Sequence, residues 1–313
     1  MIMITIENLT RKFGSLTAVD SVSFKVKKGE IVGLLGLNGA GKTTTMRMMA
    51  GALGPYGGSV NICGDDISTD PNSVKRHVGY LPEQPPLYKN MRVGEFLLFA
   101  ATIKGVSQPR AAAESAMGRT GLSNMSNRVI ETLSKGYRQR VGIAQALVHN
   151  PKVLILDEPA SGLDPAGRAE IRDLIKQIAN DNRAVILSTH LLWEVEAICS
   201  RVLILHQGKL AAKQDMSTLS VTRVAIEAGL NGLSEEKRAE VESLLLPLNQ
   251  GVTPLCSTRG VIDLNPEANR AEIATLLAPH GLIEIRKVNL LQERFSAVTG
   301  ADFGDKTLTK DGQ

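Results

Sequence analysis

A glycine-rich loop between an apolar run and a helix-forming segment constrains the fold of this chain most strongly. The apolar run Ile31–Leu35 predicts a buried strand, and the helix is expected to begin near Lys42. The loop satisfies the pattern GxxxxGK[ST], whose glycines let backbone N–H groups face phosphates at a helix N-terminus. The candidate nucleotide-binding residues are Gly36, Leu37, Asn38, Gly39, Ala40, Gly41, Lys42, Thr43 and Thr44. This order of elements predicts an α/β phosphate-loop NTPase.

Two carboxylates follow a second apolar strand. The run Leu154–Leu156 leads directly into Asp157 and Glu158. In phosphate-loop NTPases the loop lysine reaches the β- and γ-phosphates, and the loop hydroxyl and an Asp hold Mg²⁺. We therefore expect Lys42 to contact the phosphates of ATP, and both Thr43 and Asp157 to be Mg²⁺ ligands. Glu158 is expected to orient and deprotonate the attacking water.

The composition of the 313-residue chain narrows its class further. Apolar residues make up 43% and aromatic residues 4%, so aliphatic side chains must fill the cores, as they do around buried parallel strands. The net charge of +4 is dispersed, and we expect no nucleic-acid partner. The isolated cysteines Cys63, Cys199 and Cys256 indicate reduced thiols in a cytosolic protein. We expect no signal peptide, and no apolar run approaches the ~20 residues that span a bilayer.

The first predicted domain covers residues 1–219. Strands are expected at Met3–Glu7 and 18–26, followed by the glycine loop and a mainly helical stretch at about 85–150. Strands return at 153–156 and 184–187, with a helix between them. Asp164 and Pro165 are expected to cap and begin that helix. A hairpin near 201–208 closes the domain.

Residues 220–313 form a second, smaller predicted domain. The expected elements are a strand at 222–227, a helix at 234–246, two strands flanking Thr258–Gly260, a helix at 269–278 and a strand at 282–288. This βαββαβ order is typical of an α+β, ferredoxin-like module. The polar end, 302–313, is expected to fray.

The segment Leu133-Ser-Lys-Gly-Tyr137 resembles the signature LSGGQ of ATP-binding cassette (ABC) transporters. With the glycine loop and the Asp-Glu strand in the expected order, residues 1–219 resemble the nucleotide-binding subunit of that family. The resemblance implies a RecA-like core with an antiparallel β subdomain and a helical subdomain. It also implies a head-to-tail dimer that holds two ATP–Mg²⁺. In that dimer Ser134 and the Gly136 backbone of one subunit contact the γ-phosphate held by the other.

The same resemblance assigns further site residues. Ser161–Asp164 is similar to the D-loop, so Asp164 is expected at the dimer interface. His190 matches the switch histidine that touches the γ-phosphate. Phe13 occupies the position of the aromatic ring that stacks on adenine.

Two positions depart from the family pattern. The glutamine that contacts Mg²⁺ and the nucleophilic water corresponds to Glu83, with Gln84 next to it, and either residue can fill the role. The signature carries Lys135 and Tyr137 where Gly and Gln are usual. Lys135 either adds attraction for a phosphate or points to solvent.

Both departures resemble a subgroup with YLPE and S-K-G-x-x-Q-R strings, whose ATPases drive two-component ABC-2 exporters. These include gliding-motility, copper-maturation, drug and sodium-efflux relatives. The tail around Leu291–Phe295 and Thr299 is also similar. The resemblance implies a motor subunit, paired with itself or with a sister ATPase, on the cytoplasmic face of the membrane. Its partner there is a transmembrane permease subunit.

Two other functional classes fit the sequence less well than an exporter motor. Soluble cassette ATPases that act on ribosomes usually carry two cassettes, and those that act on DNA carry a long coiled coil. This chain has one motif set and no sustained heptads. A catalytically inactive scaffold is disfavoured because every hydrolytic position except that of Glu83 carries the expected residue type.

Overall fold

The computed structural model describes residues 1–180, 183–218, 220–226, 233–249, 260–264 and 268–300. The chain divides into two compact units, Met1–Met216 and Ser217–Gln313. Among the described residues, no helix is both long enough and apolar enough to cross a membrane.

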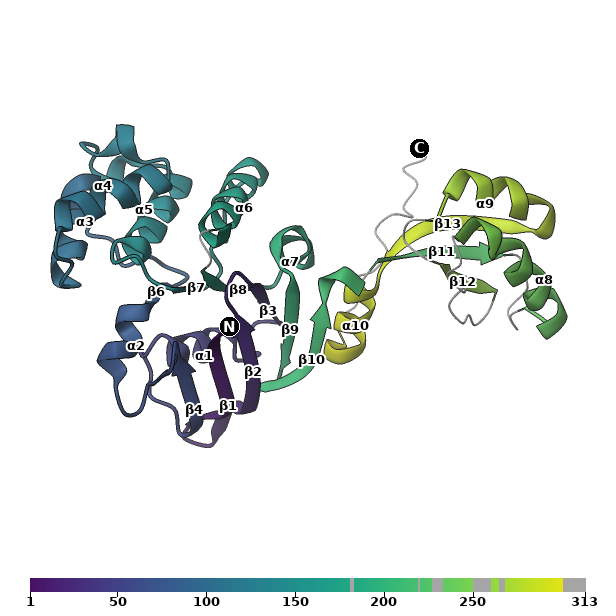
Figure 1. Ribbon diagram of the computed structural model, residues 1–313, viewed down its shortest axis with the longest axis horizontal. Helices are drawn as coiled ribbons and strands as arrows, with labels where there is room; N and C mark the ends of the chain where they lie inside the picture. The colour runs from purple at the N-terminus through teal and green to yellow at the C-terminus, as the bar shows by residue number, and fades with distance from the viewer. Residues whose placement is uncertain (181–182, 219, 227–232, 250–259, 265–267, 301–313) are drawn as a thin grey trace. The chain divides into compact units, whose positions relative to one another are not determined.

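A six-stranded sheet forms the centre of the first unit (Figure 1). Its order is β10 (Lys209–Asp215), β9 (Arg201–His206), β3 (Ile31–Leu35), β8 (Ala184–Thr189), β7 (Val153–Leu156) and β6 (Val78–Leu81). All neighbours are parallel except β9 and β10. Every residue of β3, β7 and β8 is buried, which explains the apolar runs Ile31–Leu35, Val153–Leu156 and Ala184–Leu187. These three strands were predicted.

A second, antiparallel sheet has the order β2 (Leu16–Lys27), β1 (Ile2–Phe13), β4 (Gly57–Ile62) and β5 (Asp65–Asp66). β1 runs well beyond the predicted Met3–Glu7, and β4 and β5 were not predicted. Helix α1 (Lys42–Met49) lies between the two sheets and buries Met46, Met48 and Met49 completely. Because the helix is packed on both sides, its N-terminus is held firmly at the end of β3.

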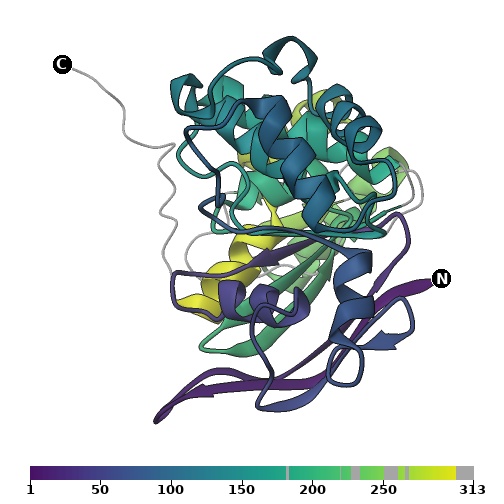
Figure 2. The ribbon, with the colours of Figure 1, turned by 90° about the vertical axis from the view of Figure 1, so that its left-hand side faces the viewer.

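The helical part of the first unit has its own core. It contains α3 (Val93–Ile103), α4 (Pro109–Arg119) and α5 (Lys135–Leu147), with 3-10 turns at Ser123–Met125 and Ile130–Thr132. Its buried side chains include Phe96, Leu97, Met117 and Val141. Figures 1 and 2 show α3–α5 gathered on the side of this unit opposite β1, β2 and β4.

Three helices complete the first unit. They are α2 (Pro71–His77), α6 (Pro165–Asn180) and α7 (Leu192–Ile198). α6 begins at Pro165, as predicted, and Asp164 Oδ1 accepts the Gly167 N–H at 2.8 Å. α7 packs on β3 next to Gly33, where a Cβ would come within 2.6 Å of Val195 Cγ1. This contact fixes the segment that follows β8.

The second unit contains a three-stranded sheet in the order β12 (Val261–Leu264), β11 (Ser220–Ile226) and β13 (Leu282–Asn289). β11 is antiparallel to both neighbours. Helices α8 (Glu235–Leu245) and α9 (Arg270–Leu277) share a core with this sheet. The second unit has 3-10 turns at Pro247–Asn249 and Ala278–His280, and a further 3-10 turn, Met216–Thr218, begins at the last residue of the first unit. The predicted strand before Thr258 lies outside the described residues.

A last helix, α10 (Leu290–Thr299), was not predicted as an element. Arg223 on β11 ties it to the sheet. Its guanidinium donates to Asp263 Oδ1 at 2.6 Å and to Glu293 Oε1 at 2.5 Å. The guanidinium thus joins two strands and this helix in one ion-pair network.

Candidate active site

The glycine loop ends in a conformation that only glycine adopts easily. Gly41 caps α1 with φ +100°, and a Cβ there would lie 2.6 Å from the carbonyl oxygen of Ala18. Lys42, the next residue, donates from Nζ to the carbonyl oxygens of Gly36 at 2.7 Å and Leu37 at 3.3 Å. Burial lowers the pKa of Lys42, and the nearby carboxylates of Glu158 and Asp157 oppose that shift. The ammonium group therefore lies at the centre of the loop.

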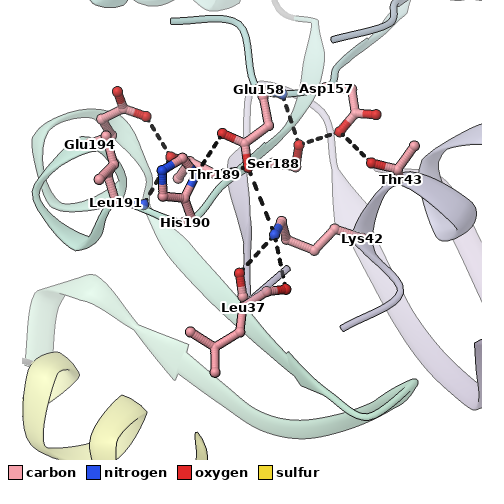
Figure 3. Close-up of polar contacts among 11 residues, drawn as sticks. Leu37, Lys42, Thr43, Asp157, Glu158, Ser188, Thr189, His190, Leu191 and Glu194 are labelled. Atoms are coloured by element: carbon pink, nitrogen blue, oxygen red, sulfur yellow. Dashed lines mark hydrogen bonds and ion pairs between the residues drawn. The ribbon is translucent and has the colours of Figure 1, made fainter. Parts of the chain in front are cut away.

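Asp157 follows β7 and is almost fully buried at 1% exposure. Its Oδ1 accepts hydrogen bonds from Ser188 Oγ at 2.6 Å and from Thr43 Oγ1 at 3.2 Å (Figure 3). Its Oδ2 is buried and has no hydrogen-bond partner in the part of the chain that the structure describes. A buried carboxylate oxygen without a donor carries a desolvation cost that a bound cation would remove.

A magnesium ion fits this pair of oxygen donors. Mg²⁺ prefers hard oxygen ligands and usually takes one or two from the protein, with phosphates and water completing the octahedron. Thr43 and Asp157 supply two such oxygens side by side. No cluster of three or more His, Cys, Asp or Glu able to hold a metal occurs among the described residues.

Glu158 lies beside Asp157 but faces a different group. Its φ of 47° is left-handed, which is uncommon for a residue with a side chain and turns the carboxylate away from that of Asp157. One carboxylate oxygen lies 3.0 Å from His190 Nδ1 and the other 3.8 Å from Lys42 Nζ. The Glu158 side chain is 11% exposed, against 46% for that of His190. The carboxylate is thus held between a lysine and a histidine at the mouth of the loop.

One pocket of about 520 Å³ collects most of the predicted nucleotide-binding positions. Its walls are Phe13, Leu16, Ala18, Leu37, Asn38, Gly39, Ala40, Gly41, Lys42, Thr43, Thr44, Glu83, Glu158, Ser161 and His190. The Arg11 guanidinium lies over the Phe13 ring, 4.9 Å from the ring centroid. Gly36 contributes through its carbonyl oxygen, and Asp157 lies behind Thr43. Glu83 lines the pocket, whereas Gln84 does not.

The predicted signature residues Ser134, Lys135 and Gly136 and the predicted interface residue Asp164 do not line this pocket, although Ser161 at the start of the D-loop segment does. Ser134 caps α5 and accepts the Tyr137 N–H at 3.4 Å, with Lys135 and Gly136 in the first turn. The Lys135 ammonium lies over Gly162 of the segment that leads to Asp164. In one chain, therefore, the pocket and the signature turn are separate.

Several residues of the site were not predicted from sequence. Leu16 and Ala18 line the pocket, as does Ser161, which was predicted only as part of the D-loop segment. Ser188 and Thr189 were also not predicted as site residues. Ser188 accepts the backbone N–H of Glu158, and Thr189 accepts the backbone N–H of Leu191, the residue after His190. The available signal was their position at the carboxyl end of a buried strand that leads directly into His190.

The fold and the pocket define a phosphate-loop NTPase with a separate helical part. The ABC transporter family model matches residues 19–161. The uncharacterized ABC transporter ATP-binding protein YhcH of Bacillus subtilis (strain 168) is 38% identical over 303 residues, covering 95% of this chain and 96% of the relative. The bacitracin transport ATP-binding protein BcrA of Bacillus licheniformis is 41% identical, covering 65% and 66%. A solved ATP-binding subunit of an ABC transporter superposes with TM-score 0.61 at 31% identity, covering 68% and 90%.

The chain therefore belongs to the ATP-binding proteins of ABC transporters. Cassettes of this family hydrolyse ATP to power transport. Among the similar solved structures, a bacterial ABC transporter cassette at 25% identity is dimeric, and cbiO1 of Clostridium perfringens at 28% identity is part of the ABC transporter complex cbiONQ.

Proposed function

We propose that this chain is the ATP-hydrolysing motor of an ABC-2-type exporter and acts as a head-to-tail dimer. The main support for this proposal is that the pocket and the signature turn are separate in one chain. Lys42, Glu158 and His190 line one pocket, whereas the turn at Ser134–Gly136 lies outside it. Helix N-termini attract anions, and the first turn of α5 contains no acidic residue. A second copy facing the first would bring that turn to the open side of the pocket.

The roles of the residues follow from their contacts. Lys42 exchanges the carbonyl oxygens of Gly36 and Leu37 for β- and γ-phosphate oxygens. When bound at Thr43 and Asp157, Mg²⁺ supplies positive charge to the same phosphates. Glu158 takes a proton from the attacking water.

The remaining site residues orient the nucleotide and sense its γ-phosphate. His190 holds the Glu158 carboxylate through Nδ1 and turns Nε2 to the γ-phosphate. Glu83 orients the water, and Phe13 stacks on the adenine. Asp164 belongs to the segment that faces the second copy. The γ-phosphate bridges the two subunits, so ATP binds the closed dimer more tightly than the open one by a few kcal/mol. Loss of the γ-phosphate removes this bridge, and the dimer opens.

The exporter subtype and the partner rest on sequence and on relatives. The YLPE and S-K-G-x-x-Q-R strings are those of the ABC-2 subgroup, and the relative BcrA is named for bacitracin transport. We place the protein on the cytoplasmic face of the membrane, bound to a separate permease.

The domain assignment belongs to the same proposal. Residues 1–219 are the ATP-binding domain, with a helical subdomain at about 85–150. Residues 220–313 are a ferredoxin-like accessory module. The strand order β12-β11-β13 with antiparallel pairing supports this fold, because a ferredoxin-like sheet places its first strand between its third and fourth.

Glu158→Gln tests the proposed mechanism. An amide cannot accept the proton of water, so phosphate release should fall at least a hundredfold while ATP binding persists. The variant should also accumulate as an ATP-bound dimer, seen as a doubled mass in light scattering. Glu114→Gln, at an exposed position on α4, is the matched control and should behave as the wild type. Phosphate release near the wild-type rate in Glu158→Gln would reject the assignment.

Co-purification separates an exporter motor from a soluble cassette ATPase. The chain, tagged and expressed in its own host, should be recovered from detergent-solubilised membranes with an integral membrane protein. Recovery with ribosomes or DNA instead would reject the exporter assignment and leave the ATPase assignment intact.

A further inference from the structure

The hydroxyl of Ser188 sits between the two consecutive acids of the site. Ser188 lies near the end of β8 and is fully buried. Its Oγ donates to Asp157 Oδ1 at 2.6 Å and accepts the backbone N–H of Glu158 at 2.9 Å (Figure 3). The hydroxyl therefore uses its proton and a lone pair on neighbouring residues of the segment after β7. The second bond fixes the backbone of Glu158 at its left-handed φ of 47°.

The next hydroxyl along the strand makes an analogous pair of bonds around His190. Thr189, also fully buried, donates from Oγ1 to Glu194 Oε2 at 2.6 Å. The same oxygen accepts the Leu191 N–H at 3.1 Å. Thr189 and Leu191 are the residues before and after His190, so this bond closes a short turn with the histidine at its tip. Glu194 is buried at 6% exposure and anchors the turn to α7.

The sheet explains why one strand end reaches both residues. Leu187 on β8 pairs with Leu156 on β7, so Ser188 lies level with the start of the Asp157–Glu158 segment. Successive side chains of a strand point to opposite faces, so Ser188 and Thr189 leave β8 in opposite directions. One hydroxyl contacts the segment after β7, and the other contacts the turn that leads to α7.

Burying these two hydroxyls does not by itself stabilise strand β8. A fully buried parallel strand favours aliphatic β-branched residues, and a buried hydroxyl is costly unless it is hydrogen-bonded. Both hydroxyls are fully hydrogen-bonded: that of Ser188 to Asp157 and Glu158, and that of Thr189 to Glu194 on α7 and to Leu191 of the His190 turn. The contact that the two bonds enclose is the 3.0 Å pair between His190 Nδ1 and Glu158 Oε2.

We propose that Ser188 and Thr189 are positioning residues that set Glu158 and His190 in register for hydrolysis. This inference rests on the proposed roles of Glu158 and His190. Ser188 fixes the backbone that presents the Glu158 carboxylate. Thr189, held by Glu194, fixes the turn that presents the His190 ring. A small displacement of either residue would separate the pair, and misplacement of a reacting group by about 1 Å can cost about a hundredfold in rate.

Four variants test the proposal through steady-state ATP hydrolysis. Thr189→Val keeps the shape and removes the hydroxyl, whereas Thr189→Ser keeps the hydroxyl and serves as its matched control. Ser188→Ala removes the other hydroxyl. We expect Thr189→Val and Ser188→Ala to lower kcat about tenfold or more, with KM for ATP changed less than about twofold. Thr189→Ser should stay within about twofold of the wild type. The fourth variant, His190→Ala, serves as the background for a double mutant.

Adding Thr189→Val to His190→Ala separates positioning from general support of the fold. If Thr189 acts through His190, the double variant should be as slow as His190→Ala alone in single-turnover assays. Multiplied losses would overturn the proposal, as would a wild-type kcat in Thr189→Val or an equal loss in Thr189→Ser. Loss of ATP binding or of cooperative unfolding in Thr189→Val would overturn it too. Normal turnover in His190→Ala or Glu158→Gln would instead reject the underlying assignment of the catalytic pair.

Discussion

Glu194 places a carboxyl group where little water reaches it. The residue is 6% exposed, and its Oε1 has no hydrogen-bond partner among the described residues. Burial raises the pKa of Glu194 above its ordinary value of 4.5, and the nearby charge of Glu158 acts in the same direction. The hydrogen bond from Thr189 and the charges of Arg168 and His190 oppose the shift. Folding therefore favours the protonated form of this carboxyl group more than the unfolded chain does.

The sign of this shift gives a testable dependence of stability on pH. A pKa raised by folding contributes stability that is fully present below the unfolded value, near 4.5, and is lost as pH rises through the folded value. Glu194→Gln removes this titration and keeps an oxygen that can accept from Thr189. The Tm of the variant minus that of the wild type should therefore become more positive as pH rises from about 4.5 to neutral. A difference that is constant across that range would contradict the expected titration.

Individual residues also show which parts of the site could be predicted from the sequence. Lys42, Thr43, Asp157 and Glu158 were predicted because each belongs to a pattern whose spacing the chemistry requires. Ser188 was not, because its contacts exist only when β8 lies beside β7, and no short pattern contains that order. Of the two Q-loop candidates, Glu83 lines the pocket.

At the scale of elements, the sequence predicted the strands and helices in which every residue is buried or in which buried residues recur at a regular spacing. β3, β7 and β8 were predicted because continuous apolar runs have few alternatives. β4 and β5 were missed because a short, half-exposed strand with glycine and aspartate carries a weak pattern. α10 was missed although Leu291 and Phe295, both fully buried, have helical spacing.

Helix α5 allows its stability and its proposed chemistry to be tested separately. Ser134 is its N-cap, and replacing such a residue by alanine costs about 1 kcal/mol. Aspartate caps a helix as well as serine does, but it adds a negative charge where we propose that a γ-phosphate of the second copy lies. Ser134→Ala should therefore lower the free energy of unfolding by about 1 kcal/mol, whereas Ser134→Asp should preserve it and abolish ATP hydrolysis. Calorimetry and phosphate release measure the two effects. Full activity in a folded Ser134→Asp protein would remove the signature turn from the mechanism.

At the scale of the whole molecule, the proposed dimer divides each active site between two chains. A protein with Ser134→Asp keeps its own Lys42 pocket, and a protein with Lys42→Met keeps its own signature turn. Each homodimer then has two defective sites. A mixed dimer has one site in which both parts are intact and one in which both are altered. This follows from head-to-tail symmetry and needs no further assumption about the fold.

Mixing the two inactive proteins should therefore restore hydrolysis. With equal amounts and random pairing, about half of the dimers are mixed and each has one of its two sites intact, so activity should reach about a quarter of the wild-type value. The restored rate should rise with total protein concentration, because it depends on association. A control mixture of Lys42→Met with Glu158→Gln should stay inactive, since both changes lie in the same half of the site and no intact site can form. Activity that stays at the level of the separate variants, in a mixture shown by light scattering to contain dimers, would mean that each chain completes its own pocket.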